Sequence, residues 1–466
     1  MHYCPSALSE LLDRFRPCFS RPGYRHFARL IVAWILVQGT HTISRLIPLM
    51  RRFGLHRHHA AVYRFFSQAS WSQADVGRVV FGLLQPLLSS RVQAIVDDTL
   101  CAKSGRQIFG TAIHHDAARS TYRVGRRIEV LTVGHLWVVL AVYVPCPWKA
   151  GRGWAIPLLF DLYRSPKRCP AHRYRKRSEI ALAQLVRLQG WLAPGQPLVA
   201  TGDAAYCCKT VLRGLSGKAH FVGPLPLDAA LYDQVERPSG KGRPRRKGYR
   251  IANPETRLQN HTSRTRRDWK EAEVVLYGRT VHVRYATLVC VWYHSAGTAP
   301  VRVVLTRDAK GPGAGRAYVS TDPDLSAHEI LATYARRWQL EVTFREIKQE
   351  LGFEDPRNGW WRRSAGKRDN PCRPPRENKR GKKAVERTAP LAGTVYALTV
   401  LWYLEAGRRH VDVARVRRDA PWYRHKHDVS FADMRNALRL DIWRTRIPKR
   451  IRRIAANLWC LAGNAA

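Results

Sequence analysis

The sequence predicts an α/β protein whose central sheet has mixed strand directions, and three observations support this fold class. Residues 24–90 show apolar residues at helical spacing. Residues 91–222 then alternate between strand, hairpin, strand, helix and strand. A run of β-type segments follows, and residues 327–351 return to a helical pattern. We therefore expect a helical region, an α/β region and a β-rich region along one chain.

Length and charge limit what the chain can be. Its 466 residues suggest two to four domains. Lysine and arginine number 80 against 35 acidic residues, so the formal net charge is +45. A compact body with that charge repels itself unless an anion lies against it, and nucleic acid is the favoured partner because each neutralised phosphate releases counterions. A membrane surface would require a basic amphipathic helix or a lipidation signal, and the sequence shows neither.

The cysteines and the apolar stretches indicate the compartment. The ten cysteines are scattered without a CxxC pair, which disfavours a disulfide framework or a zinc site. The N-terminus lacks the apolar core of a signal peptide, and the longest apolar stretches are too short to span a membrane. We expect a soluble cytoplasmic protein with no membrane partner.

The elements follow in order. Four short helical runs over residues 24–90 carry Arg and His on their outer faces, as in a small DNA-binding bundle; a plain helical packing domain is the alternative. Arg91–Val96 is a short strand that ends in Asp97-Asp98-Thr99. Residues 128–144 are expected to form a hairpin that turns near Gly134, and residues 154–163 a further strand. Residues 178–192 form a helix, 196–201 a strand that runs into Gly202-Asp203, and 220–222 another short strand.

The second half begins with a basic loop over residues 237–250 and a meander of roughly four strands. Residues 357–387 are basic and rich in Pro and Gly, which predicts a flexible segment. Residues 391–404 read as a buried helix, and the tail from Arg408 to Arg453 as basic and partly helical.

Three carboxylate positions could carry chemistry. Asp97 or Asp98 lies at the end of one strand, and Asp203 at the end of another. Ligands commonly bind at such edges of an α/β sheet. Glu341 lies within the helical run TYARRWQLEVTFREIKQELGF. Two hard cations acting on a phosphodiester need an acidic cluster of this kind. The alternative for each aspartate is a turn or helix cap.

The helix around Glu341 carries a mixed polar face. Tyr334, Arg337, Glu341 and Lys348 follow the spacing Y-x2-R-x3-E-x6-K and fall within an arc of roughly 60° on an ideal helix. Such a face is not an apolar core stripe. It is either a surface helix with Arg337–Glu341 and Glu341–Arg345 ion pairs, or a metal-binding glutamate flanked by groups that hold DNA phosphates.

This signature, with D-x-T at a first strand and G-D-x-x-Y at a later one, resembles the bacterial insertion-sequence transposases of DDE type. The segment VDDTLCAKSGRQIFGTAIHHDAA is also similar to the region around the first catalytic aspartate in one branch of these transposases. The resemblance covers about residues 25–410. It implies a ribonuclease H-like catalytic domain, a mixed sheet flanked by helices. A β-rich insertion domain would interrupt it between Asp203 and Glu341.

The resemblance also implies a division of the chain. Residues 1–90 would be a helical DNA-binding domain and 408–466 a basic C-terminal region. Residues 91–222 and 326–407 would form the two parts of the catalytic domain, separated by the insertion domain at 223–325.

By the same resemblance, the catalytic and metal-binding residues are Asp97, Asp203 and Glu341, with Asp98 as the alternative first aspartate. Tyr206 occupies the aromatic position that follows Asp203. The expected cofactor is a pair of Mg²⁺ ions, for which Mn²⁺ can substitute. The residues expected to contact DNA are Tyr334, Arg337, Arg345, Lys348 and Trp292. Trp292 would stack on a flipped base, unless it is a core residue of the meander, and the Trp360-Trp361 pair is another stacking candidate.

The implied function is metal-dependent cleavage at transposon ends followed by transfer of the 3′-OH into target DNA. The partners would be double-stranded DNA and a second copy of the chain in the synaptic complex, in the bacterial cytoplasm at the nucleoid. Two alternatives stay open: a non-catalytic, domesticated DNA-binding protein, and a structure-specific nuclease on the same fold.

Overall fold

The computed structural model describes residues 4–52, 58–103, 108–116, 119–123, 126–215, 219–235, 245–259, 269–276, 279–308, 315–356 and 379–446. The chain forms two compact units. The helical unit consists of Met1–Leu83, Gly105–Phe109 and Arg345–Ala466, and the sheet unit of Leu84–Ser104 and Gly110–Phe344. The five-part division expected from the sequence stays a prediction.

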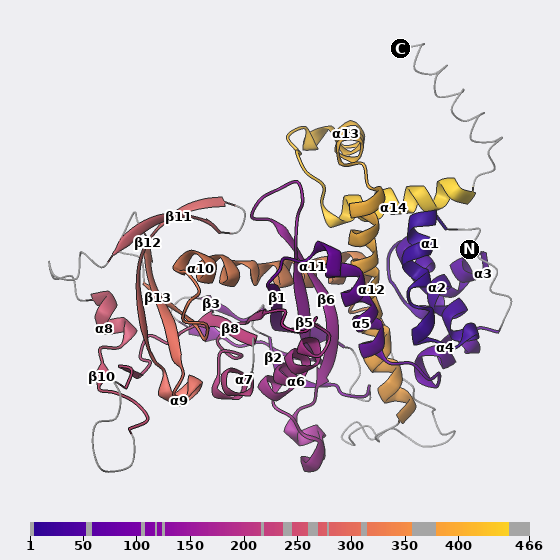
Figure 1. Ribbon diagram of the computed structural model, residues 1–466. Helices are drawn as coiled ribbons and strands as arrows, with labels where there is room; N and C mark the ends of the chain where they lie inside the picture. Colours follow the sequence, from indigo (N-terminus) through magenta and orange to yellow (C-terminus); the bar gives the residue numbers. More distant parts are fainter. Residues whose placement is uncertain are drawn as a thin grey trace. The chain divides into compact units, whose positions relative to one another are not determined.

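The helical unit combines the N-terminal helices with the C-terminal ones (Figure 1). Its helices are α1 (Ser6–Asp13), α2 (Arg21–Leu36), α3 (Ile43–Arg52), α4 (Ala60–Ser67), α5 (Gln73–Leu84), α12 (Lys379–Ala406), α13 (Arg409–Asp419) and α14 (Phe431–Arg446). The Ser20 hydroxyl caps α2 by accepting a hydrogen bond from the Gly23 amide. Buried Arg387 of α12 donates to the carbonyls of Phe66, in the last turn of α4, and Ala69, just beyond it, which satisfies backbone groups at the end of that helix.

The sheet unit is built on one twelve-stranded mixed sheet. Its strands are β1 (Val92–Ala102), β2 (Ala112–His115), β5 (Leu131–Pro145), β6 (Gly153–Tyr163), β7 (Leu198–Thr201), β8 (Ala219–Pro224), β9 (Leu231–Tyr232), β10 (Arg250–Ile251), β11 (Lys270–Leu276), β12 (Arg279–Val291), β13 (Pro300–Asp308) and β14 (Arg316–Ser320). A separate hairpin joins β3 (Thr121–Arg123) to β4 (Arg126–Ile128). The helices are α6 (Arg177–Gln189), α7 (Lys209–Gly214), α8 (Pro254–Gln259), α9 (Tyr293–Ala296) and α10 (Ala327–Arg336).

The strand order is β10-β9-β12-β13-β14-β8-β7-β1-β5-β2, with β11 beside β12 and β6 beside β5. Strands β1, β7 and β8 are parallel, whereas β5 runs antiparallel to β1. The predicted α/β class with mixed strand directions is confirmed. The predicted meander is present as β11 to β14, and it extends the central sheet through the β14–β8 pair.

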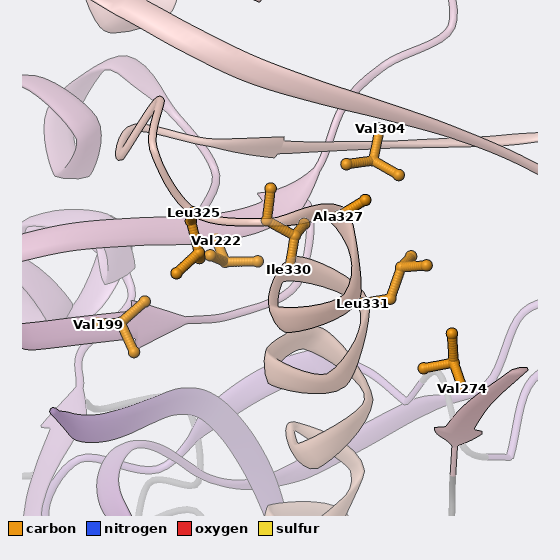
Figure 2. Close-up of a cluster of buried hydrophobic side chains, with 8 residues drawn as sticks. All are labelled: Val199, Val222, Val274, Val304, Leu325, Ala327, Ile330 and Leu331. Atoms are coloured by element: carbon orange, nitrogen blue, oxygen red, sulfur yellow. The ribbon is translucent and has the colours of Figure 1, made fainter. Parts of the chain in front are cut away.

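Helix α10 covers one face of this sheet through an apolar cluster. Ile330 and Leu331 of α10 pack with Val199 of β7 and Val222 of β8, as Figure 2 shows. Val274 and Val304 extend the cluster toward the later strands. Removing these side chains from water fixes α10 against the strands that precede the candidate site.

Three sequence expectations need correction. Residues 131–145 form one continuous strand, β5, and no hairpin turns at Gly134. A Cβ at residue 134 would lie 2.3 Å from the Cys101 carbonyl oxygen, so the glycine serves the close approach of β1 and does not make a turn. The strand expected to end in Asp97-Asp98-Thr99 continues to Ala102, because β5 pairs with it along that length.

Third, the Pro- and Gly-rich composition of residues 357–387 predicts a flexible segment, but residues 379–387 form the first turns of α12. Residues 391–404 lie in this helix and are almost entirely buried, as predicted. Residues 357–378, with Trp360 and Trp361, lie outside the described residues, as does most of the 237–250 loop. In the described part of the chain, no helix has both the length and the apolarity needed to cross a membrane.

Candidate active site

The candidate site forms where β1 and β7 diverge. The parallel pairing of these strands ends at Ile95 and Thr201, two residues before Asp97 and Asp203 respectively. Beyond that point the backbone of β7 turns away, and the Asp203 carboxylate accepts a hydrogen bond from the Ala205 amide at 2.9 Å. The topology therefore brings together two carboxyl groups that are 106 positions apart in the sequence.

Helices α10 and α11 (Trp338–Leu351) supply the third carboxylate and a cation. Ser326 begins α10 with a capping box in which Glu329 bonds back to the Ser326 amide. The continuous helix expected over 327–351 is interrupted at Arg337, which is the C-cap of α10 and immediately precedes α11. Glu341 lies in the first turn of α11.

Arg337 joins two of the predicted catalytic acids. Its guanidinium lies 2.9 Å from Asp97 Oδ2 and 2.8 Å from Glu341 Oε1. The Arg337–Glu341 pair is the one that a plain surface helix would also contain. The bond to Asp97, however, joins residues 240 positions apart and places the junction of α10 and α11 beside β1. Arg337 and Asp97 are largely buried, with side-chain exposures of 17% and 13%.

The register shows which face of the sheet each aspartate occupies. Gln93 of β1 donates to the Thr333 carbonyl of α10 at 2.8 Å, so the α10 face carries Gln93 and, by alternation, Asp97. Asp98 lies opposite Val138, and Val138 opposite Asp161. The Asp161 carboxylate accepts a hydrogen bond from Gln184 of α6 at 2.8 Å. Asp98 therefore lies on the α6 face, opposite to Asp97.

Asp98 has its own partners on that face. Its Oδ2 accepts hydrogen bonds from Arg177 at 2.8 Å and from the Tyr206 hydroxyl at 2.9 Å. Tyr206 is 1% exposed, so this phenol–carboxylate bond is shielded from water. Sequence reasoning missed Arg177. The available signal was composition, because residues 164–177 contain seven Lys or Arg residues and no acid, and Arg177 is the last of them.

Burial dominates the electrostatics of the site. Burial raises the pKa of Asp97 to about 7; Arg337 opposes the shift, and the charges of Asp203 and Asp98 add to it. The pKa of Asp203 is raised by burial and by the nearby Asp98. Burial alone would lower the pKa of Arg337, but Asp97 and Glu341 outweigh it and raise that pKa. The carboxylates of Asp97 and Glu341 therefore stabilise a positive charge that lies between them.

The donor set fits a divalent cation of the magnesium type. All three predicted ligands are carboxylates, which hard cations prefer, and two of them have raised pKa values that a cation would reverse. Among the described residues, no three such side chains already lie close enough to hold an ion. The Arg337 guanidinium lies between Asp97 and Glu341, where it neutralises both.

The other predicted DNA-contacting residues have different surroundings. The Tyr334 ring lies 4.9 Å from the Tyr318 ring, with the Arg337 guanidinium 5.7 Å from the Tyr334 ring centre. Arg345 is exposed, and Lys348 pairs with Glu354 at 3.3 Å within the helical unit. Trp292 is 5% exposed at the start of α9, so its ring is covered, as the core alternative expected.

Comparison with known families identifies the class of protein. The family model described as DDE superfamily endonuclease matches residues 14–280, more than half of the chain. The chain therefore belongs to this endonuclease family. A second model, described as archaeal putative transposase ISC1217, matches residues 272–367. The chain is accordingly a DDE transposase enzyme.

One solved structure extends the comparison. The chain is similar to a piggyBac transposase in a synaptic complex with hairpin DNA. The two share 11% sequence identity with a TM-score of 0.36, over 97% of this chain and 80% of the other. No curated protein matches the chain.

Proposed function

We propose that this chain is a cut-and-paste DNA transposase that cleaves phosphodiesters at transposon ends and joins the freed 3′-OH to target DNA. One observation carries the proposal: Asp97, on the same face of the sheet as α10, shares Arg337 with Glu341 and interacts electrostatically with Asp203. The sequence left Asp97 and Asp98 as alternatives, and the position of Asp97 beside Glu341 favours Asp97 as the first catalytic aspartate.

Asp97, Asp203 and Glu341 would hold the magnesium ions. When bound, such ions polarise a phosphodiester and lower the pKa of an attacking water. The protein's own part is to bury the carboxyl groups, which strengthens their attraction for a cation. Arg337 provides an internal positive charge in the free protein, and its guanidinium has the geometry to donate two hydrogen bonds to a phosphate.

The proposal extends to DNA recognition. Tyr334, Arg345 and Lys348 would contact backbone phosphates beside Glu341, and the N-terminal helices would bind the transposon end. The sheet continuing from β1 to β14 supports a ribonuclease H-like core extended by the 223–325 segment. Two transposon ends are joined in one event, so we propose a homodimer in the synaptic complex.

Cleavage of a donor plasmid that carries the gene with its genomic flanks tests the function. The purified protein with Mg²⁺ should excise the flanked segment, and Glu341→Gln should reduce excision by about a thousandfold or more while DNA affinity changes little. Glu346→Gln is the matched control on the same helix, because Glu346 bonds to Tyr396 and should retain excision. Excision by Glu341→Gln at the wild-type rate would contradict the assignment.

A pre-cut end separates the remaining alternatives. A transposase joins such an end to a second duplex, whereas a structure-specific nuclease leaves the two molecules separate. A non-catalytic DNA-binding protein would bind both duplexes and change neither.

A further inference from the structure

A basic segment joins β6 to α6 beside the candidate site. We call residues 164–177 the basic connector. It contains seven Lys or Arg residues, one His and no acid. Its two short 3-10 turns, Pro166–Arg168 and Ala171–Arg173, are both part of the described structure. The connector therefore places seven like charges on a segment that contains two helical turns.

The connector contains one internal hydrogen bond and is tied to the sheet at its end. Within it, Arg164 donates to the Arg168 carbonyl at 2.8 Å. At its end, Arg177 is the first residue of α6 and forms the ion pair with Asp98. Between these points Lys167, Arg175 and Lys176 are exposed. In the described part of the chain, none of these three has an ion-pair partner.

The connector adjoins the α6 face of the sheet, because Arg177 reaches Asp98 from that face. The proposed DNA contacts at Tyr334 and Arg337 lie on the α10 face instead. One strand, β1, thus carries adjacent aspartates whose partners on opposite faces are both arginines. The basic connector and the proposed α10-side DNA contacts therefore lie on opposite faces of the sheet and are separate surfaces.

Charge decides what can cover the connector. Seven cations within 14 residues repel one another, and an anionic partner relieves that repulsion. A DNA backbone presents phosphates in a regular row and releases counterions when lysines or arginines neutralise them. A second copy of this chain would bring its own excess of +45 and is disfavoured as the occupant.

We propose that the basic connector is a DNA-backbone binding surface, distinct from the α10 and α11 contacts, which Arg177 links to Asp98 beside the proposed catalytic Asp97. The inference rests on the proposed function, since it deepens how the substrate is held. It gives the enzyme contacts to DNA on both faces of the sheet, so that a duplex segment beyond the cleaved bond is also held.

The salt dependence of DNA affinity tests this surface without any need for cleavage. The variant Arg175→Gln/Lys176→Gln is compared with the full-length wild type on a generic duplex, in the absence of divalent metal. Each lost phosphate contact lowers the slope of log Kd against log salt by about 0.9, so the slope should fall by about 1.8. Affinity at physiological salt should weaken by about tenfold.

The matched control removes the same charge elsewhere in the sheet unit. Arg187→Gln/Lys270→Gln alters two exposed residues, one at the far end of α6 and one at the start of β11. This control should leave the slope near the wild-type value. Equal slopes for the wild type and the connector variant would overturn the proposal, as would an equal fall in both variants.

Lysine acetylation with mass spectrometry gives a second readout that does not depend on a mutant's folding. Bound duplex should protect Lys167 and Lys176 of the wild-type protein at least about threefold, while Lys270 stays reactive. Unprotected Lys167 and Lys176 at saturating DNA would overturn the proposal. Because neither experiment measures excision, a protein that binds as expected but never excises would contradict the proposed function alone.

Discussion

Asp97 and Asp98 are neighbours on β1, yet they have different surroundings. Asp97 lies on the α10 face and shares Arg337 with Glu341. Asp98 lies on the α6 face and is held by Arg177 and Tyr206. Successive side chains of an extended strand point to opposite faces, so two identical residues acquire two environments. The role of an acid in such a pair is therefore set by the helix that covers its face of the strand.

The largest expected effect separates the two aspartates directly. Asp97→Asn should reduce excision by about a thousandfold or more, which corresponds to about 4 kcal/mol of transition-state stabilisation. Asp98→Asn keeps the same size and should cost less than about tenfold, because its partners lie away from Glu341. Single-turnover cleavage rates with saturating DNA measure both. A greater loss from Asp98→Asn would reverse the assignment of the first aspartate.

The next effect concerns the cation on the Asp97 side. Arg337→Ala should tighten Mn²⁺ binding in the absence of DNA by between about tenfold and a hundredfold, since Arg337 and the ion compete for the same carboxylates. Isothermal titration at pH 8 checks this. Arg177→Ala, on the Asp98 side, is the control and should change Mn²⁺ affinity little. Weaker Mn²⁺ binding by Arg337→Ala would mean that the guanidinium supports the site and does not compete.

A buried carboxylate in the helical unit provides a reference for the burial effect. Burial raises the pKa of Glu346 from its ordinary value of 4.5 to about 7, although its hydrogen bond from the Tyr396 hydroxyl opposes the shift. Because the folded-state pKa lies above the unfolded value, its contribution to stability is complete below pH 4.5 and is lost as the pH rises through 7.

The wild type should therefore lose on the order of 2 kcal/mol of stability through this group between pH 4.5 and 7. Glu346→Gln should flatten that part of the profile. Urea unfolding at a series of pH values measures it. Identical pH profiles for the wild type and the variant would show that burial does not raise the pKa of Glu346.

The smallest effect tests the Asp98 side. Tyr206→Phe removes the hydroxyl that donates to Asp98 and should destabilise the protein by about 1 kcal/mol, with excision largely retained. A double-mutant cycle with Asp98→Asn isolates the pair, and urea unfolding supplies the four free energies. Additive losses would show that the two side chains do not interact in solution.

Much of the fold was predictable because it depends on local pattern. The helices of residues 24–90, the strands at 154–163 and 196–201 and the buried helix at 391–404 follow from apolar spacing, which reports burial directly. The failures occurred where a distant partner decides the structure. Gly134 resembles a turn glycine until β1 is placed beside it, and β1 extends past Asp97 only because β5 pairs with it.

The candidate site shows the same division. Spacing alone placed Tyr334, Arg337 and Glu341 near one another, since a helix repeats every 3.6 residues. It could not reveal that Arg337 reaches Asp97, or that Arg177 and Tyr206 hold Asp98, because these contacts join residues from 79 to 240 positions apart.

The sequence by itself determined the chemistry available to this protein: a strong positive charge, few acids, and a helix that carries Arg and Glu on one face. Only the tertiary structure decided which of the two adjacent aspartates faces that helix. The physical reason is that residue type and local periodicity are properties of the sequence alone. The environment of each face of a strand, in contrast, depends on the distant segment that packs against it.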